Sequence, residues 1–216
     1  MHRFFASTKN TRPVLPGSLR YIRSDVPLQV TEEEKQWLAG HNITTVVDLR
    51  TERERAAKPC PLEQDGRFRC LHLPVTGGDA LPESPAWVAQ SYINMADDRM
   101  EGILKTITEA ESNVLFFCTA GKDRTGVFTM LLLALAGVEW ADILADYTVS
   151  ELYLEGLTTD ISGSNVHNMR MLRAFLEKEY GSAEEYLLGL GASKEELDAF
   201  RSLFVCTEGD NEQGGW

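Results

Sequence analysis

The segment Cys118 to Gly126 carries the residues best suited to chemistry and reads Cys-Thr-Ala-Gly-Lys-Asp-Arg-Thr-Gly. An apolar stretch over 113–117 precedes it, so a predicted buried strand delivers the cysteine into a short loop before a helix. Gly121 and Gly126 let the loop turn its N–H groups inward, and such a nest at a helix N-terminus favours an anion. A thiol in this positive field ionises easily, and the guanidinium of Arg124 can hold two oxygens of a phosphate.

These properties predict phosphoryl transfer by covalent catalysis. The phosphate is expected to contact one continuous loop, formed by Cys118, Thr119, Ala120, Gly121, Lys122, Asp123 and Arg124. The Cys118 thiolate attacks phosphorus, and water then hydrolyses the thiophosphate, while Arg124 and the loop N–H groups stabilise the equatorial oxygens. Thr125 can donate a hydrogen bond to the sulfur and ease its departure. We expect no metal or other cofactor, because the loop supplies the positive charge, and we expect phosphate or sulfate to bind there.

Three other interpretations fit the residues of this loop less well. A lone cysteine at a strand end is most often a buried structural residue, but the surrounding Gly, Lys, Arg and Thr favour a site. A nucleotide-binding loop needs Lys followed by Ser or Thr, whereas Lys122 is followed by Asp123. A sulfurtransferase also places a cysteine in an anion-binding loop, but the six-residue step to Arg124 argues against it.

Composition sets the class of protein. The 216 residues are 43% hydrophobic and 25% charged, which is typical of a globular chain. The net charge of −12, from 21 basic and 33 acidic residues, disfavours binding to nucleic acid. No apolar run could span a bilayer, no standard secretory signal is present, and the four cysteines form no CxxC pair. We therefore expect a cytoplasmic protein without a transmembrane segment, and leave export by a non-standard route open.

Strand and helix patterns alternate up to the loop and are helical after it. Strands are predicted over 19–23, 43–49, 68–75 and 113–117, and helices over 31–40, 51–57, 84–97, 100–111, 127–136, 140–151, 166–180, 183–188 and 194–205. This order predicts an α/β fold with a central, mostly parallel sheet flanked by helices and a helical C-terminal part. We divide the chain into an N-terminal arm (1–17), one domain (18–206) and a disordered acidic tail (207–216).

The loop resembles the Cys-x5-Arg-[Ser/Thr] signature of the cysteine-dependent protein tyrosine phosphatase superfamily. Its fuller form resembles the bacterial branch whose loop reads His-Cys-x-x-Gly-Lys-Asp-Arg-Thr-Gly and which includes the mycobacterial protein tyrosine phosphatase B. Flanking strings are also similar to the family: Val46 to Arg50 with Glu52 and Arg53, Ala145 to Tyr147, and Tyr180 to Ser182 with Tyr186 and Leu187. The resemblance covers roughly residues 19–205 and implies a cysteine-phosphatase-like domain.

The resemblance implies that Cys118 is the nucleophile and that Arg124 clamps the phosphate. Lys122 and Asp123 match the pair that marks the bacterial branch. Lys122 would be an extra cation at the pocket mouth, which in relatives goes with accepting phosphoinositides as well as phosphotyrosine. Phe117 stands where the family usually has His, so we expect Cys118 to ionise less readily.

The general acid has two candidates. Relatives place an aspartate in a loop soon after a Leu-Pro pair, and here Asp79 follows Leu73-Pro74 with an offset of about two residues. Asp123 is the alternative because it lies in the phosphate loop itself. At the end of the central strand, Asp48 and Arg50 are expected to brace the loop or to form a structural ion pair. Asp146 and Tyr147 are expected to serve in packing.

The main prediction is a metal-independent phosphomonoesterase that hydrolyses phosphotyrosine through a cysteinyl-phosphate intermediate, with phosphoserine and phosphothreonine as further candidate substrates. One alternative is a phosphoinositide phosphatase, which Lys122 and the basic residues 1–30 favour. The other is a pseudophosphatase that binds phosphate without turnover, which Phe117 and the displaced Asp79 suggest.

Overall fold

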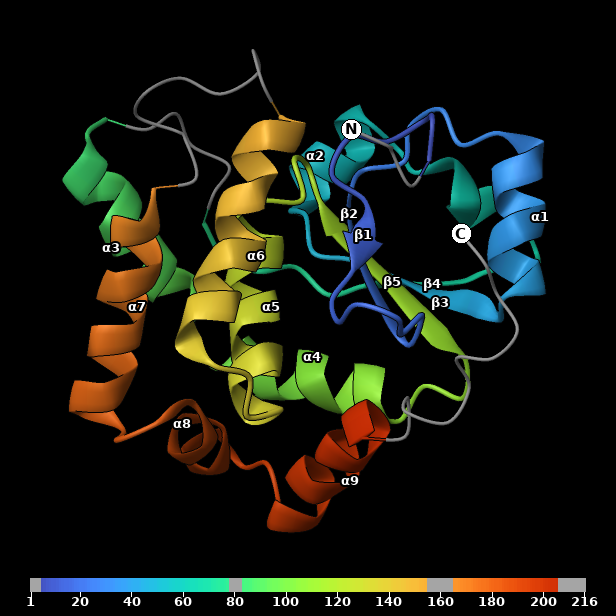
Figure 1. Ribbon diagram of the computed structural model, residues 1–216. Helices are drawn as coiled ribbons and strands as arrows, with labels where there is room; N and C mark the ends of the chain where they lie inside the picture. Colours follow the sequence, from blue (N-terminus) through green and yellow to red (C-terminus); the bar gives the residue numbers. More distant parts are fainter. Residues whose placement is uncertain (1–4, 78–82, 155–164, 206–216) are drawn as a thin grey trace.

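The computed structural model describes residues 5–77, 83–154 and 165–205 (Figure 1). Its strands are β1 (Arg12–Pro13), β2 (Tyr21–Asp25), β3 (Ile43–Asp48), β4 (Arg69–His72) and β5 (Asn113–Cys118). Its helices are α1 (Glu32–Gly40), α2 (Glu52–Ala57), the 3-10 turn η1 (Pro61–Gln64), α3 (Pro85–Met95), α4 (Arg99–Thr108), α5 (Asp123–Leu135), α6 (Trp140–Tyr153), α7 (Val166–Glu179), α8 (Ala183–Leu190) and α9 (Lys194–Val205).

The described strands form one sheet in the order β1-β2-β5-β3-β4. Only the pairing of β1 with β2 is antiparallel, so the predicted, mostly parallel sheet is confirmed. In the centre, β5 places Cys118 opposite Asp25 of β2 and Phe117 opposite Asp48 of β3. Because ligands of open α/β sheets bind at the carboxyl ends of parallel strands, this register brings the cysteine to the expected edge.

Alternate residues of the central strands enter two separate cores. On β5, Phe116 and Cys118 face the larger core, which helices α3 to α9 cover. Leu115 and Phe117 face the smaller core, to which α1 contributes Leu38 and η1 contributes Leu62. Figure 1 shows the two helical layers on opposite sides of the sheet. Both faces are covered, which explains why the central strand β5 is apolar from Val114 to Cys118 rather than alternating.

Helix α5 lies within the larger core, since nearly all of its residues from Arg124 to Leu135 are buried. An unbroken apolar run such as Val127 to Leu133 suits a helix that is covered on every side. The helix begins at Asp123 rather than at the predicted residue 127, so the second half of the phosphate loop forms its first turn. At Gly126 a Cβ would lie 3.2 Å from Met169 Cε and 3.2 Å from Tyr147 Cδ2, so glycine permits close packing of α5 against α6 and α7.

The predicted elements were found with boundaries shifted by a few residues, and the structure adds β1 and η1, which were not predicted. Both N-terminal helices begin at capping boxes, at Thr31 with Glu34 and at Thr51 with Glu54. Residues 5–17, expected as an arm, pack on the sheet, because β1 pairs with β2 and Phe5 and Val14 are buried. The predicted tail lies outside the described residues.

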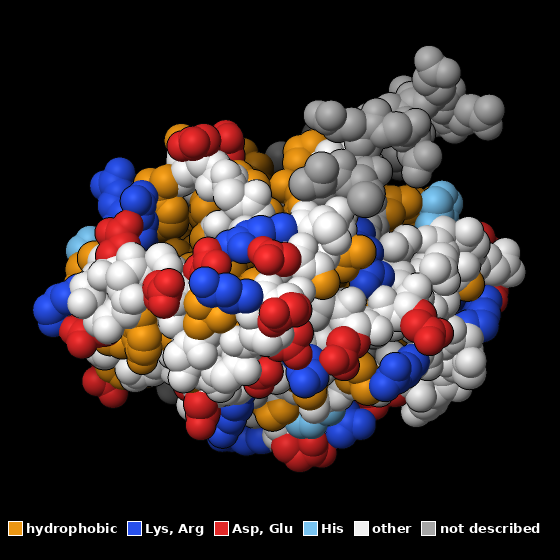
Figure 2. Space-filling view, turned by 90° about the horizontal axis from the view of Figure 1, so that it is seen from below, with side chains coloured by type: hydrophobic (Ala, Val, Ile, Leu, Met, Phe, Trp, Pro, Cys, Tyr) orange, Lys and Arg blue, Asp and Glu red, His pale blue; other side chains and the backbone are white. Residues whose placement is uncertain are grey.

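Charge on the surface is dispersed. Figure 2 shows acidic and basic side chains interspersed with small hydrophobic areas on the face seen from below. Ion pairs of the described residues include Lys105 with Glu196 and Arg201 with Glu184. Among the described residues, no helix combines the length and apolar character needed to cross a bilayer.

Candidate active site

The predicted loop residues lie together in one turn between β5 and α5. Cys118 ends the strand, Lys122 is the N-cap of the helix, and Asp123 is its first residue. Cys118 and Arg124 are each only 2% exposed. Gly121 has a φ of +66°, and a Cβ there would lie 2.4 Å from the carbonyl oxygen of Ser24. The turn therefore requires glycine at this position, both for its backbone conformation and for the close approach of β2.

The carbonyl groups of the loop are held from outside by the N-terminal segment. Asn10 Nδ2 donates to the oxygens of Ala120 and Gly121, both at 3.0 Å, and Arg23 Nη2 donates to that of Gly121 at 2.7 Å. The backbone N–H of Val26 donates to the carbonyl of Thr119 at 3.3 Å. In a trans peptide the next N–H points opposite to the carbonyl. The N–H groups that follow these carbonyls therefore point away from the N-terminal segment, as an anion-binding nest needs.

Asp146 of α6 was expected to serve in packing, and the structure shows that its carboxylate instead binds two arginines of this support. Its carboxylate accepts from Arg12 Nε at 2.9 Å and also from Arg23 Nη1. Burial and the neighbouring Arg23 lower the pKa of Arg12 to about 10. Burial acts to raise the pKa of Asp146, but the two arginines bring it below its ordinary value. The carboxylate is thus the shared counter-ion of two arginines, of which Arg12 donates to the carbonyl of Asn10 and Arg23 to that of Gly121.

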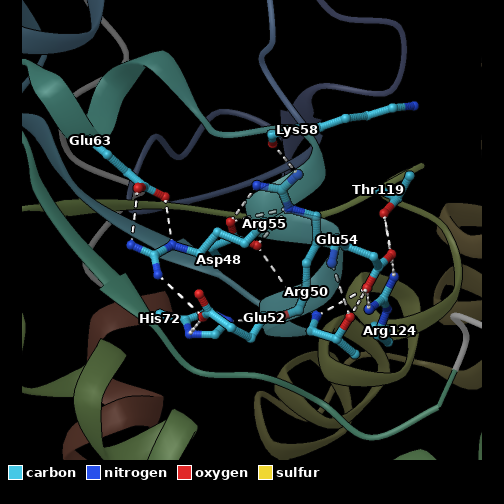
Figure 3. Close-up of polar contacts among 11 residues, drawn as sticks. Asp48, Arg50, Glu52, Glu54, Arg55, Lys58, Glu63, His72, Thr119 and Arg124 are labelled. Carbon is cyan, nitrogen blue, oxygen red and sulfur yellow. Dashed lines mark hydrogen bonds and ion pairs between the residues drawn. The ribbon is translucent and has the colours of Figure 1, made fainter.

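Arg124 is fixed by Glu54 of α2, a residue that the sequence analysis missed (Figure 3). Its Nη1 and Nη2 donate to the two carboxylate oxygens at 2.6 Å each, and Thr119 Oγ1 donates to the same carboxylate at 2.5 Å. Burial acts to raise the pKa of Glu54, but the hydrogen bonds from Arg124 and Thr119 lower it to about 2. Burial acts to lower the pKa of Arg124, but the bond to Glu54 and the charge of Cys118 hold it above its ordinary value.

A local signal for Glu54 was available in the sequence. As the N3 residue of the capping box, its side chain also accepts from the backbone N–H of Thr51 at 3.0 Å. Helix α2 starts directly after β3, at the same sheet edge as Cys118. A capping glutamate at that edge lies close enough to serve both the helix end and the phosphate loop.

Lys122 and Asp123 form an ion pair at the start of α5. The side chain of Lys122 is only 4% exposed, and its Nζ lies 3.3 Å from Asp123 Oδ1. The resemblance implied that Lys122 is an extra cation at the pocket mouth, whereas the structure buries its side chain. The same Oδ1 accepts from the hydroxyl of Tyr92 on α3 at 2.5 Å, and Tyr92 is hydrogen-bonded to the hydroxyl of Tyr147 on α6 at 2.6 Å. Tyr147 packs in the larger core as expected, and its hydroxyl adds a hydrogen bond that the sequence did not predict.

Two polar atoms of the loop are buried without a partner in the described structure. They are Nε of Arg124 and Oγ1 of Thr125. The predicted hydrogen bond from Thr125 to the sulfur of Cys118 is not among the contacts of the described residues. Buried donors usually have a partner, so these two are available to a bound group. Asp79, the other candidate acid, lies outside the described residues.

Phe117 lies in β5 at the position where the family usually has histidine. It is fully buried in the smaller core, and the guanidinium of Arg50 lies 5.4 Å from its ring centroid. Arg50 also binds Asp48 through Nη2 at 2.6 Å and Nε at 2.9 Å (Figure 3). Of the two expectations for Asp48 and Arg50, the buried ion pair is the one observed. Residues 5–77, 83–154 and 165–205 contain no group of three or more side chains arranged to hold a metal ion.

Comparisons with known proteins place the chain in a family. The sequence model described as the tyrosine phosphatase family matches residues 6–206. A tyrosine-protein phosphatase of Nostoc commune is 28% identical over 213 residues, which cover 84% of this chain and 72% of that protein. A relative in Cupriavidus necator is 30% identical over 147 residues, 61% of this chain and 53% of that protein.

Among solved structures, a TpbA variant of P. aeruginosa in complex with pTyr is 18% identical to the chain. It matches 88% of this chain and 100% of its own with a TM-score of 0.48. The family match covers nearly the entire chain, including both the N-terminal segment that supports the loop and the helices that surround it. The chain therefore belongs to the tyrosine phosphatase family and is a phosphatase.

Proposed function

We propose that this phosphatase hydrolyses phosphotyrosine through a covalent cysteinyl-phosphate intermediate and without a metal ion, as members of the Cys-x5-Arg branch would. The observation that carries the proposal is the single turn that joins Cys118 to Arg124, in which the carbonyl groups of Thr119, Ala120 and Gly121 are bonded from outside. The N–H groups that follow these carbonyls supply the nest. A thiolate, a nest and a guanidinium are the nucleophile and the positive charge that phosphoryl transfer needs. The family and the Nostoc commune relative support a tyrosine ester as substrate.

The reaction takes place in two displacements. Phosphate binds to the loop N–H groups and to Nε of Arg124. The Sγ–P bond forms as the bond from phosphorus to the ester oxygen breaks, and that oxygen takes a proton from a carboxylic acid. Water then attacks phosphorus and gives its proton to the same carboxylate. The S–P bond breaks, which releases inorganic phosphate and restores the thiolate.

Glu54 acts as a positioning residue for the clamp. It uses one proton on each Nη of Arg124, and Nη2 also lies 3.4 Å from Thr119 Oγ1, so Nε is the donor left without a partner for the phosphate. A guanidinium whose two Nη atoms are already held loses little conformational entropy when substrate binds. Thr119 contributes to the same alignment through its bond to the Glu54 carboxylate.

Asp123 and Asp79 remain the two candidates for the acid. Asp123 lies in the first turn of α5 with a side chain that is 29% exposed, so water or a leaving group can reach it. An Asp123→Asn variant should lower kcat/KM more for poor leaving groups than for good ones, and Asp79→Asn should not. The reverse result would assign the role to Asp79.

The proposal is tested by replacing the sulfur. Cys118→Ser should lose turnover of 4-nitrophenyl phosphate and of a phosphotyrosine peptide, yet still bind the peptide. Cys60→Ser is the matched control, because Cys60 is also buried but packs in the smaller core. Rapid acid quenching of the wild type with labelled peptide should trap label on Cys118. Full activity of Cys118→Ser, or label on another residue, would refute the mechanism.

The same measurements separate the alternatives. Faster turnover of a phosphoinositide than of the phosphopeptide would favour the lipid phosphatase, although the burial of Lys122 removes its expected role at the mouth. Binding of phosphate without any turnover would favour the pseudophosphatase. Comparable rates with phosphoserine peptides would extend the substrate range beyond tyrosine.

A further inference from the structure

A buried chain of hydroxyl groups ends on Asp123. The Tyr147 hydroxyl on α6 lies 2.6 Å from that of Tyr92 on α3, and Tyr92 donates to Asp123 Oδ1 at 2.5 Å. Tyr92 is fully buried, and Tyr147 is 1% exposed. The chain links two helices that are distant in sequence to the first residue of α5.

The chain has a defined direction. Tyr92 uses its single proton for Asp123, so its oxygen accepts the proton of Tyr147. Burial and the charge of Asp123 raise the pKa of Tyr92 well above its ordinary value, and burial raises that of Tyr147 as well. Both hydroxyls therefore stay protonated at neutral pH and act as donors towards the carboxylate.

The two oxygens of Asp123 have different surroundings. Oδ1 receives the Tyr92 hydroxyl and lies 3.3 Å from Lys122 Nζ. Within the described residues, Oδ2 has neither a hydrogen bond nor an ion pair. A proton shared with substrate would therefore be carried by Oδ2, while Oδ1 fixes the orientation of the group.

We infer that Tyr92, held by Tyr147, is a positioning residue that fixes Asp123 through Oδ1 and so directs Oδ2 to the leaving oxygen of the substrate. This inference rests on the proposed function. As Oδ2 gives its proton to the ester oxygen, negative charge develops on the carboxylate. The hydrogen bond from Tyr92 then strengthens, because bonds to an ionised acceptor are about twice as strong as neutral ones. A contact that strengthens along the reaction lowers the barrier.

The test compares kcat/KM for esters of different leaving groups, because this constant includes P–O cleavage but not hydrolysis of the intermediate. Tyr92→Phe removes one hydroxyl and keeps the ring. It should lower kcat/KM about tenfold for phenyl phosphate and less than about twofold for 2,4-dinitrophenyl phosphate, whose leaving group departs without a proton. Tyr147→Phe should show the same pattern with a smaller loss. Tyr186→Phe is the matched control, because this buried hydroxyl donates to the carbonyl of Asp97, away from the loop.

A double variant separates positioning from packing. In an Asp123→Asn background, Tyr92→Phe should produce no further change in the leaving-group dependence, because the hydroxyl acts only through the carboxylate. Equal losses for both esters in Tyr92→Phe, with wild-type leaving-group dependence retained, would overturn the inference while leaving the proposed function intact. An unchanged leaving-group dependence in Asp123→Asn would overturn it too. If Tyr92→Phe does not fold, Tyr147→Phe decides by the same criterion. Absence of turnover in the wild type would instead reject the proposed function itself.

Discussion

The contact between Glu54 and Arg124 joins the stability of the fold to the proposed chemistry. Replacing Glu54 by glutamine keeps the size of the side chain but removes its charge and one acceptor. The amide can then accept only one of the two Nη bonds, each 2.6 Å long, that now hold Arg124. The guanidinium remains 2% exposed and loses its counter-charge.

The expected magnitude follows from the pKa of Glu54. Its fall from 4.5 to about 2 corresponds to about 3 kcal/mol of folding free energy at neutral pH, at ~1.4 kcal/mol per pH unit. The side chain is 21% exposed, so screening by water reduces the expected loss to about 2 kcal/mol. Because the folded-state pKa is depressed, this contribution is complete above the unfolded value near 4.5 and is lost as the pH falls towards 2.

Urea unfolding of wild type and Glu54→Gln between pH 7 and pH 3 measures this difference. The variant should be about 2 kcal/mol less stable at pH 7, and the two curves should converge below about pH 5. Its kcat/KM should fall about 10- to 100-fold, because Arg124 is no longer aligned. Glu32→Gln is the matched control, since Glu32 also binds an arginine through two bonds but lies at the surface, and it should change little. A stability difference that stays constant with pH would refute the reasoning.

Two further substitutions test the construction of the loop. Gly121→Ala should lower the unfolding free energy by more than the ~1–2 kcal/mol that a left-handed conformation costs, because its Cβ would meet the backbone of Ser24, and its kcat/KM should fall sharply. Gly102→Ala is the control, because a Cβ there meets open space. Its thermal stability and kcat/KM should be unchanged or improved. Phe117→His should lower the unfolding free energy by about 1–3 kcal/mol without raising kcat/KM, because a polar ring would be buried beside Arg50. A higher kcat/KM would contradict this and show that the usual histidine still fits this fold.

Local patterns were sufficient for most elements of the fold. The apolar run over Asn113–Cys118 and the glycine-rich turn after it are contiguous, so strand, loop and helix could be read together. The capping boxes at Thr31 and Thr51 mark the starts of α1 and α2, and they too are formed by residues close together in the sequence. Strand β1 was not predicted, because two residues are too few to show a hydrophobic periodicity and their pairing depends on β2.

The polar support of the loop could not be read in this way. Asn10 lies 110 positions before Ala120, and Arg23 lies 123 positions before Asp146, yet each pair is hydrogen-bonded. Hydrophobic periodicity tells which face of an element is buried, but it does not tell which polar side chain from elsewhere will satisfy a buried carbonyl. For this reason the sequence predicts packing for Asp146 and Tyr147 but not their hydrogen bonds.

The sequence by itself determined the order of strands and helices and the loop that joins Cys118 to Arg124, because neighbouring residues encode both. The tertiary structure alone decided what surrounds that loop. It placed Glu54 on Arg124, the N-terminal segment on the loop carbonyls and the Tyr92 hydroxyl on Asp123. Buried charges and carbonyl groups require partners, and only the closed fold brings those partners within hydrogen-bonding distance.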